Sequence, residues 1–296
     1  MSDYILSCCS AIDISPQTIE KYGIHYVPFH FFVDEKEYTD DFGASMPYKE
    51  FYDKIRAGAD TRTSQVNISE FTDYFAAFLE QGYDIVHVCL SSGLSGTVNS
   101  AKNAAAILKE RFPERNIYIV DSLGASAGYG LLMVSAAEKR DEGLSAAELA
   151  QWIEDNKLNV HHWFFSTDLS TYVKGGRISK TAAVFGGALK ICPLLNMDNL
   201  GRLIPREKVR TKKKVISEIV ARMEQNAIDG LDYSGRCFIS ASDCIDDARE
   251  VAALVEARFP NIKGGKVEIS DIGTIIGSHT GTGTVALFFF GNKREN

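Results

Sequence analysis

The stretch DIVHVCLSSGLSGT, residues 84–97, joins an apolar, β-prone run to a segment with helical spacing. Asp84–Leu90 has the composition of a buried strand, and the residues from Val98 to Arg111 have the spacing of a helix. The Gly-rich turn between them directs backbone N–H groups toward the space over the helix N-terminus, where the helix dipole favours an anion. This junction therefore predicts an α/β fold with an anion-accepting turn, although such a turn is structural about as often as functional.

The same alternation recurs through the first half of the chain. Short apolar runs precede longer segments with helical spacing, which predicts βαβ units and a doubly wound, mainly parallel sheet. The predicted strands cover Tyr4–Ser7, His25–Val33, Asp84–Leu90 and Ile117–Val120, and the predicted helices cover Met46–Arg56, Ser69–Gln81, Val98–Arg111 and Ala125–Glu142.

The pattern changes after a further predicted helix at Ser145–Glu154. Strands are predicted at His162–Ser166, Leu203–Pro205, Cys237–Ser240, Val267–Ile269 and Val285–Phe290, and helices at Lys180–Leu189, Lys212–Asn226 and Asp246–Arg258. These elements predict a second α/β domain with a mixed sheet. We expect the domains to cover residues 1–156 and 157–296.

Composition excludes several classes of protein. The 296 residues include 32 Lys and Arg against 39 Asp and Glu, a formal net charge of −7, which disfavours binding to nucleic-acid phosphates. No apolar run approaches the roughly 20 residues that cross a bilayer, and the N-terminus lacks the pattern of a signal peptide. We therefore expect a cytoplasmic protein that does not insert stably into membranes.

The six cysteines form no C-x-x-C pair, so neither a zinc site nor a disulfide framework is indicated. We expect reduced thiols and no bound metal. Cys8 and Cys9 directly follow the first predicted strand. A nucleophilic role there would need a positioned base, so we interpret both as small, polarisable lining residues.

Three other segments carry candidate binding residues. The segment Thr61–Gln65 suits hydrogen bonding to a carboxylate or phosphate, but its hydroxyls are equally typical of a cap or turn. Residues 276–284, IGSHTGTGT, place His279 in a predicted loop, where functional residues concentrate. Arg177, in the Gly-rich turn Lys174–Ser179, has a guanidinium suited to orienting an anion or to locking the two domains together.

One basic cluster, Arg206–Lys214, stands out in this acidic chain. The simpler interpretation is a solvated helix start, and the alternative is a docking surface for an acidic partner.

A serine hydrolase is the alternative drawn from another functional class. Ser95, then Asp243 or Asp271, then His279 follow the Ser-Asp-His order of α/β-hydrolases. The nucleophile elbow G-x-S-x-G is not matched, however, because the five residues around Ser95 read GLSGT. The turn also lacks the Lys of a P-loop and the spacing of the dinucleotide motif G-x-G-x-x-G.

Taken together, these motifs resemble the DegV family of bacterial fatty-acid-binding proteins nearly end to end. The resemblance rests on their order and spacing: Thr63-Ser64-Gln65, Leu90–Thr97 with Ser100-Ala101, Asp121-Ser122, Gly175–Ile178 with Lys180, Pro193-Leu194-Leu195 and Ile276–Gly281.

The resemblance implies a two-domain α/β protein that encloses one long-chain fatty acid, such as palmitate, with the carboxylate at the domain junction and the tail in an apolar tunnel. It implies that the hydroxyls of Thr63 and Ser95 bind the carboxylate. The residues implied in the surrounding polar network are Ser64, Gly96, Thr97, Arg177 and His279. It also implies a non-catalytic protein without a cofactor, which presents the acid to an ATP-dependent fatty acid kinase for acyl-phosphate formation.

The chain departs from the family pattern after its first strand. The family commonly has Asp-Ser-Thr there, whereas this chain has Ser7-Cys8-Cys9-Ser10, with Cys8 in place of the usual aspartate.

Overall fold

The structure is a computed structural model that describes residues 4–179 and 191–295. The helix predicted at Lys180–Leu189 therefore lies entirely outside the described residues. Of the described strands, four form a parallel sheet in the order β2 (His25–Val27), β1 (Tyr4–Cys9), β6 (Asp84–Cys89) and β7 (Ile117–Asp121). Cys8 and Cys9 are the last two residues of β1 rather than residues after it, and both are buried.

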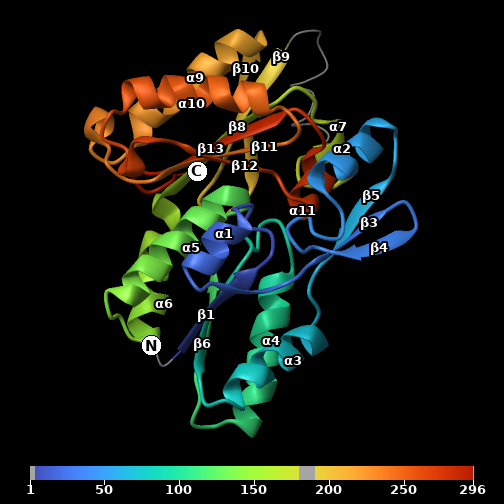
Figure 1. The fold of residues 1–296 in the computed structure, drawn as a ribbon, viewed down its shortest axis with the longest axis vertical. Helices are drawn as coiled ribbons and strands as arrows, with labels where there is room; N and C mark the ends of the chain where they lie inside the picture. The colour runs from blue at the N-terminus through green and yellow to red at the C-terminus, as the bar shows by residue number, and fades with distance from the viewer. Residues whose placement is uncertain (1–3, 180–190, 296) are drawn as a thin grey trace.

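Helices cover both faces of the parallel sheet (Figure 1). On one side lie α3 (Ile68–Leu79) and α4 (Thr97–Arg111), and on the other lie α5 (Ser126–Asp141) and α6 (Ala146–Asn156). Both α3 and α6 begin with a capping box, in which the side chains of Asn67 and Ser145 accept hydrogen bonds from the third helical N–H. The short α1 (Pro16–Lys21) connects β1 to β2. The predicted doubly wound arrangement is confirmed.

A small antiparallel sheet, which the sequence did not predict, has the order β4 (Lys36–Thr39), β3 (His30–Val33) and β5 (Thr61–Ser64). The single strand predicted at His25–Val33 is wrong, because the chain leaves β2 at Pro28 and enters β3 in a different sheet. Proline has no N–H for a strand ladder, which explains the break. α2 (Tyr48–Arg56) lies between β4 and β5 in the sequence.

Six of the described strands form a mixed sheet, in which one pair is parallel and the others are antiparallel. Its order is β10 (Leu203–Arg210), β9 (Ile191–Met197), β8 (Val160–Ser166), β13 (Thr284–Phe290), β11 (Cys237–Ala241) and β12 (Glu268–Asp271). Helices α9 (Lys212–Asn226) and α10 (Ile245–Arg258) cover one face (Figure 1). Short 3-10 helices cover Lys157–Asn159, Gly230–Asp232 and Lys263–Gly265.

Helix α5 packs on the other face of the mixed sheet and also contacts the parallel sheet. Its Tyr129 hydroxyl accepts a hydrogen bond from the Cys9 N–H at 3.1 Å and donates to the carbonyl of Val88 on β6. All residues of α5 from Ser126 to Ala137 except Ser135 are buried, as expected for a helix enclosed on several sides. At Gly128, an added Cβ would lie 2.4 Å from the His162 ring, so the glycine permits this close approach.

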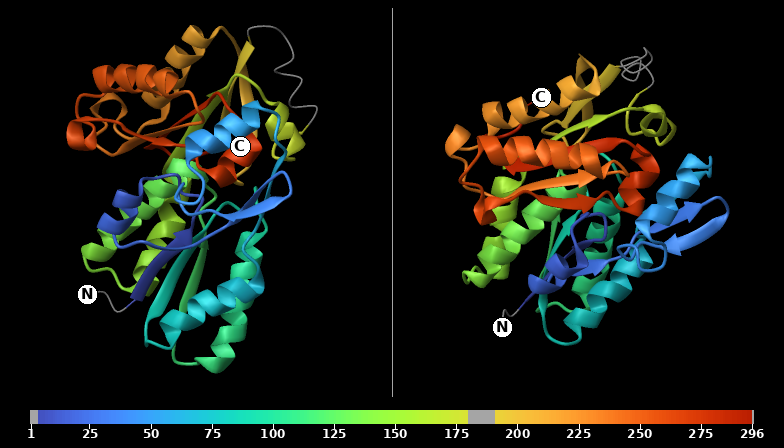
Figure 2. Two further views of the ribbon diagram at one scale, coloured as in Figure 1. Left: turned by 45° about the vertical axis from the view of Figure 1, so that its right-hand side comes forward. Right: turned by 45° about the horizontal axis from the view of Figure 1, so that its top comes forward.

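Two short helices, α7 (Ser170–Lys174) and α11 (Thr274–Thr280), lie where the two halves of the chain meet. The views in Figure 2 show α11 beside α2, although the two are far apart in sequence. The predicted loop around His279 is wrong, because His279 occupies the last turn of α11. The domain division at residue 156 stays a prediction. None of the described helices has both the length and the apolar character needed to cross a membrane.

Candidate functional site

The parallel sheet has a topological switch point between β1 and β6. The chain leaves β1 toward β2 on one side and leaves β6 toward β7 on the other, so the loops at their carboxyl ends diverge. Open α/β sheets bind ligands in the crevice formed at this place. Here the residues that follow β6, including Leu90, Leu94 and Ser95, line a cavity of about 360 Å³.

Five of the seven site residues predicted from the sequence line this one cavity. They come from four separate segments of the chain: Thr63, Ser95, Gly96, Arg177 and His279.

The other two predicted residues, Ser64 and Thr97, do not line it. Ser64 follows Thr63 along β5, and successive strand residues point to opposite faces. Thr97 is buried beneath the site, with its Oγ1 2.8 Å from Oγ of Ser95. Its place is therefore behind a lining hydroxyl rather than on the cavity surface.

The imidazole of His279 is paired with the hydroxyl of Thr63, and Nε2 lies 2.8 Å from Oγ1. Burial, and then the positive charge of Arg177, lower the pKa of His279 to about 4, so the ring is neutral at pH 7. Its Nδ1 is buried and has no hydrogen-bond partner among the described residues.

The tautomer of His279 follows from this unequal environment. A buried N–H without an acceptor is less tolerated than an unused lone pair, so we assign the proton to Nε2. Nε2–H then donates to Thr63 Oγ1, and the hydroxyl proton of Thr63 is available to donate into the cavity. The pair is thus arranged as a donor for an acceptor group of a ligand.

Ser95 and Gly96 bring a second set of donors to the cavity at the start of α4. The N–H of Thr97 donates to Ser95 Oγ at 3.3 Å, so this oxygen is already held by the first helical turn. α4 has 15 residues, and its dipole favours an anion at this end. An added Cβ at Gly96 would lie 2.8 Å from Oε1 of Gln65, which also lines the cavity.

Arg177 links the turn after α7 to the loop after β6. Its Nη1 donates to the carbonyl of Gly175 at 2.5 Å, and its Nη2 donates to the carbonyl of Leu94 at 3.1 Å. The side chain is partly buried, and burial lowers the pKa of its guanidinium. Of the described residues that line the cavity, none is a carboxylate, so the cavity favours a negative group near this arginine.

The rest of the cavity wall is mostly apolar, and sequence reasoning missed most of it. The apolar lining residues are Phe29, Leu90, Leu94, Ala125, Phe164, Tyr172, Met197, Leu203, Ile272, Ile275, Ile276, Ala286 and Phe288. Ala286 and Phe288 alternate along β13, which is the signal of a shared face, but a sequence alone does not say which face meets a cavity.

His162, on β8, also lines the cavity. Its Nδ1 donates to the carbonyl of Val160 at 3.0 Å, and its Nε2 accepts from the N–H of Ala125 at 3.3 Å. Burial holds the pKa of His162 well below its usual range. Both ring nitrogens are occupied, so this histidine has no free polar atom for a ligand.

Two buried carboxyl groups hold the start of α11, and sequence reasoning missed both. Asp13 accepts from the N–H of Gly273 at 2.9 Å and from the hydroxyl of Ser126 at 2.5 Å. Asp40 accepts from the hydroxyl of Thr274 at 2.6 Å. Burial raises the pKa of Asp13 to about 7 and also raises that of Asp40. These contacts set the position of the helix that carries His279.

The side chains of the alternative hydrolase hypothesis are not assembled as a triad among the described residues. The Ser95 hydroxyl is paired with Thr97, and His279 Nε2 is paired with Thr63. Asp243 pairs with Arg56, and no carboxylate in the described part of the chain, that of Asp271 included, is hydrogen-bonded to Nδ1 of His279. A serine nucleophile needs a base within hydrogen-bond reach that is itself oriented by a third group, and this arrangement supplies neither.

Comparisons with known proteins agree on one family. Its sequence model, described as uncharacterised proteins of the DegV family, matches residues 9–292. A DegV domain-containing protein of Clostridium perfringens is 35% identical over 295 residues, covering 100% of both chains. The structure of DegV of Bacillus subtilis, described as a fatty acid binding protein, has a TM-score of 0.83 at 26% identity, covering 99% of this chain and 100% of that one.

A further solved structure shows the same fold at lower identity. The fatty acid kinase B3 protein of Streptococcus pneumoniae, loaded with linoleic acid, has a TM-score of 0.84 at 21% identity and covers 99% of this chain and 100% of that one. The family match extends over nearly all of the sequence, and the full-length curated relative carries the same domain name. This chain therefore belongs to the DegV family.

Proposed function

We propose that this protein binds one long-chain fatty acid, such as palmitate, in the cavity at the switch point. The carboxylate accepts hydrogen bonds from the hydroxyls of Thr63 and Ser95, and the acyl chain lies along the apolar wall. The single observation that carries the proposal is that both hydroxyls line one cavity of about 360 Å³ whose remaining wall is mostly apolar.

The division of the cavity matches the two parts of a fatty acid. Burying about fourteen methylenes contributes on the order of 10 kcal/mol before ordering costs, at about 0.8 kcal/mol each. The head group loses its hydration when it enters and needs donors in return. The Thr63 hydroxyl, oriented by His279, and the α4 N-terminus at Ser95 supply them, and Arg177 adds a positive charge nearby.

The related proteins support the same ligand class. The Bacillus subtilis relative, at 26% identity, is described as a fatty acid binding protein. A DegV family protein of Thermus thermophilus, also 26% identical, is described by its fatty acid binding. The assignment of Thr63 and Ser95 is supported by the family resemblance and by the fact that both residues line this cavity.

We further propose that the bound acid is presented to an ATP-dependent fatty acid kinase, which carries out the phosphoryl transfer, and that the binding protein itself is not catalytic. The described cavity supplies no assembled nucleophile and base, which favours binding over hydrolysis.

The basic cluster offers a docking surface for that kinase. Its exposed residues include Arg210 at the end of β10 and Lys213 and Lys214 in the first turn of α9. Cations are disfavoured at a helix N-terminus by the dipole, so these lysines reduce local stability, and the binding of an acidic partner would offset that cost. Leu203, at the start of the same strand β10, lines the cavity, and Arg210 lies seven residues further along the strand, about 23 Å away at about 3.3 Å per residue.

Native mass spectrometry of the protein purified from a bacterial host tests the binding proposal. We expect a mass increment equal to one C16 to C18 fatty acid, which is lost on delipidation and regained when palmitate is added. A delipidated protein that takes up no fatty acid would reject the proposal. Hydrolysis of an acyl ester that is abolished by Ser95→Ala would establish the hydrolase instead.

A further inference from the structure

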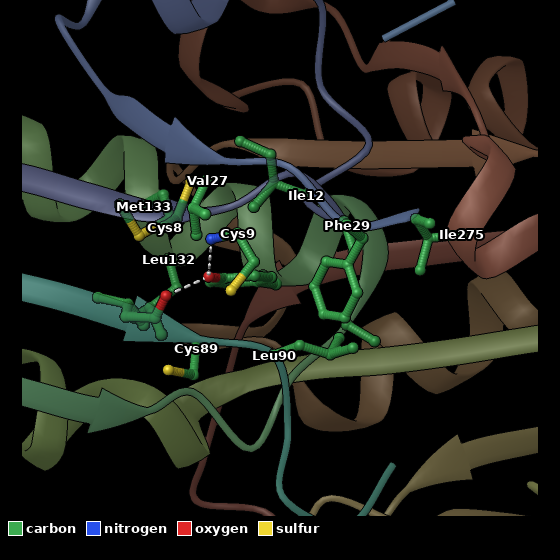
Figure 3. Packing of buried hydrophobic residues seen from close by; sticks show 14 of the residues in the cluster. Cys8, Cys9, Ile12, Val27, Phe29, Cys89, Leu90, Leu132, Met133 and Ile275 are labelled. Carbon is green, nitrogen blue, oxygen red and sulfur yellow. Dashed lines mark hydrogen bonds between the residues drawn. The ribbon is translucent and has the colours of Figure 1, made fainter. Parts of the chain in front are cut away.

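Three side chains with soft or nitrogen donor atoms meet between β1 and β6, outside the cavity. The strand register pairs Ser7 with His87 and Cys8 with Val88, and its continuation brings Cys9 beside Cys89. The sulfur atoms of Cys9 and Cys89 and a ring nitrogen of His87 all lie within 4.8 Å of one another, and all three residues are buried. Figure 3 shows Cys9 and Cys89 on adjacent strands, with Cys8 directed away from Cys89.

The imidazole of His87 is oriented toward the sulfur atoms. Its Nδ1 lies 2.8 Å from Oγ of Ser7, and its Nε2 lies 3.7 Å from Sγ of Cys9. The rings of Phe71 and Phe75 on α3 pack against the imidazole in T-shaped arrangements, with centroids 5.2 and 5.1 Å away. If Nδ1–H donates to Ser7, the lone pair of Nε2 faces the two thiols.

This arrangement has the features of a metal site with its supporting shell. A metal-bound histidine typically donates its second ring N–H to an oxygen acceptor, which fixes the tautomer and the ring orientation. Sulfur and nitrogen ligands at about 2.3 and 2.0 Å from one tetrahedral cation lie about 3.5 Å apart. The observed 3.7 Å between Cys9 Sγ and His87 Nε2 is close to that separation.

We propose that Cys9, His87 and Cys89 bind a thiophilic metal cation, Zn²⁺ or Cu⁺. Two thiolates and one imidazole are the donor set that soft and borderline cations prefer over Mg²⁺ or Ca²⁺. Zn²⁺ with two thiolates gives a centre without net charge, as a fully buried position requires. Cu⁺ suits a three-ligand centre, and its centre would be without net charge if one of the two cysteines kept its proton. The proposal goes beyond fatty acid binding and does not depend on it.

The metal would fix the ends of the two strands that form the switch point. Leu90, the residue after Cys89, lines the cavity. Ser10, the residue after Cys9, accepts a hydrogen bond from the N–H of Phe29 at 3.1 Å, and Phe29 also lines the cavity. A cation bound by Cys9 and Cys89 therefore holds two parts of the cavity wall in place.

A packing role is the alternative, because buried cysteines commonly act as small apolar side chains. Cys8 and Cys9 are adjacent and equally buried in β1. A packing role predicts that Cys8→Ala and Cys9→Ala have the same effect on metal affinity. A metal site predicts that they differ, because Cys8 lies outside the cluster. Cys8→Ala is therefore the matched control for Cys9→Ala.

The test uses tag-free full-length protein, reduced and freed of metal, titrated separately with Zn²⁺ and with Cu⁺ against a competing chelator. We expect one equivalent of one cation in the wild type and in Cys8→Ala. Cys9→Ala and Cys89→Ala should lose at least tenfold in affinity. Ser7→Ala should lose roughly 10- to 100-fold, because it removes the partner that orients His87. Whichever cation saturates at one equivalent identifies the metal.

Two measurements on the wild type keep the proposal testable if the cysteine variants fail to fold. Co²⁺ should give a thiolate-to-cobalt charge-transfer band, and the preferred cation should raise the melting temperature of the metal-free protein. Absence of the band together with less than a tenth of an equivalent of Zn²⁺ and Cu⁺ would overturn the proposal. Equal metal binding by Cys8→Ala, Cys9→Ala and Cys89→Ala, or isolation of the protein as a Cys9–Cys89 disulfide lighter by two hydrogens, would also overturn it.

Discussion

Gly175 lies directly against the imidazole of His279, and a Cβ added at Gly175 would come within 2.5 Å of Nδ1. The backbone of Gly175 has φ −73° and ψ −6°, a conformation that any residue adopts. Glycine is therefore needed at this position for space rather than for conformation. Its neighbour Gly176 is the reverse case, with φ +71° and no atom within 4 Å of an added Cβ.

We predict that Gly175→Ala lowers fatty acid affinity by displacing His279. The added methyl group pushes the ring away from Thr63, so the Thr63 hydroxyl loses the partner that orients it. Loss of one such hydrogen bond weakens binding by roughly 3- to 10-fold. Displacement of a fluorescent fatty acid from the delipidated protein measures the change.

A double-mutant cycle separates this effect from a general disturbance of the turn. In a His279→Ala background the added methyl group has nothing to displace, so Gly175→Ala should then cause little further loss. Additive losses in the double variant would show that the two residues act independently and would contradict the prediction.

Removal of either proposed head-group donor should weaken fatty acid binding. Thr63→Val keeps the shape of the side chain and removes the hydroxyl, and Ser95→Ala does the same at the start of α4. A hydrogen bond to a charged acceptor contributes about 1.5 to 3 kcal/mol, so each variant should bind palmitate roughly 10- to 150-fold more weakly. Isothermal titration with palmitate gives the affinity directly.

Ser92→Ala is the matched control for Ser95→Ala, because Ser92 is an exposed serine of the same loop and does not line the cavity. It should bind as the wild type does. Unchanged affinity in both Thr63→Val and Ser95→Ala would mean that the carboxylate lies elsewhere.

Most of the helices and strands are predicted from the sequence because the residues that determine them lie within the element itself. Lys212–Asn226 is helical over the whole predicted range, and the strand–turn–helix unit around residues 84–97 forms as predicted. The errors occur where contacts with residues far away in the sequence determine the structure. Thr61–Ser64 becomes a strand because β3 lies beside it, and residues 274–280 form a helix whose start is held by Asp13 and Asp40.

The same difference between local and distant signals applies to the candidate site. Thr63, Ser95, Arg177 and His279 were predicted from motifs, and all four line the cavity. The apolar wall was not predicted, because which side of β8 or β13 faces the cavity depends on how the mixed sheet packs against α5. A one-residue change of register would reverse every side chain of such a strand, and no local pattern encodes that choice.

Asp13 should make the protein less stable as the pH rises from about 4 to about 7. Burial raises its pKa to about 7 in the folded protein, above the value of about 3.9 in an unfolded chain. The neutral form is thus favoured by folding, and its contribution is complete below pH 4 and lost as pH rises through 7. The loss is about 1.4 kcal/mol per unit of pKa difference.

Asp13→Asn should remove this dependence, so its melting temperature relative to the wild type should rise between pH 4 and 7.5. Asparagine preserves an acceptor for Gly273 and tolerates the φ of +43° at this position. Asp73→Asn, at an exposed position of α3, is the control. A constant difference between Asp13→Asn and the wild type across this range would refute the assignment.

Charge reversal of the basic cluster should impair transfer to the kinase and leave lipid binding intact. Arg210, Lys213 and Lys214 are exposed, so replacing all three with Glu changes the surface potential without altering the core. Complementary charge mainly accelerates encounter, so acyl-phosphate formation at limiting kinase should fall by at least about tenfold at low salt and less at high salt.

Reversal of three exposed lysines elsewhere, Lys21, Lys102 and Lys266, makes the same change in net charge and should leave the rate nearly unaffected. Equal effects of the two triple variants would show a response to net charge rather than a docking surface, and loss of palmitate binding in the first would assign the cluster a structural role.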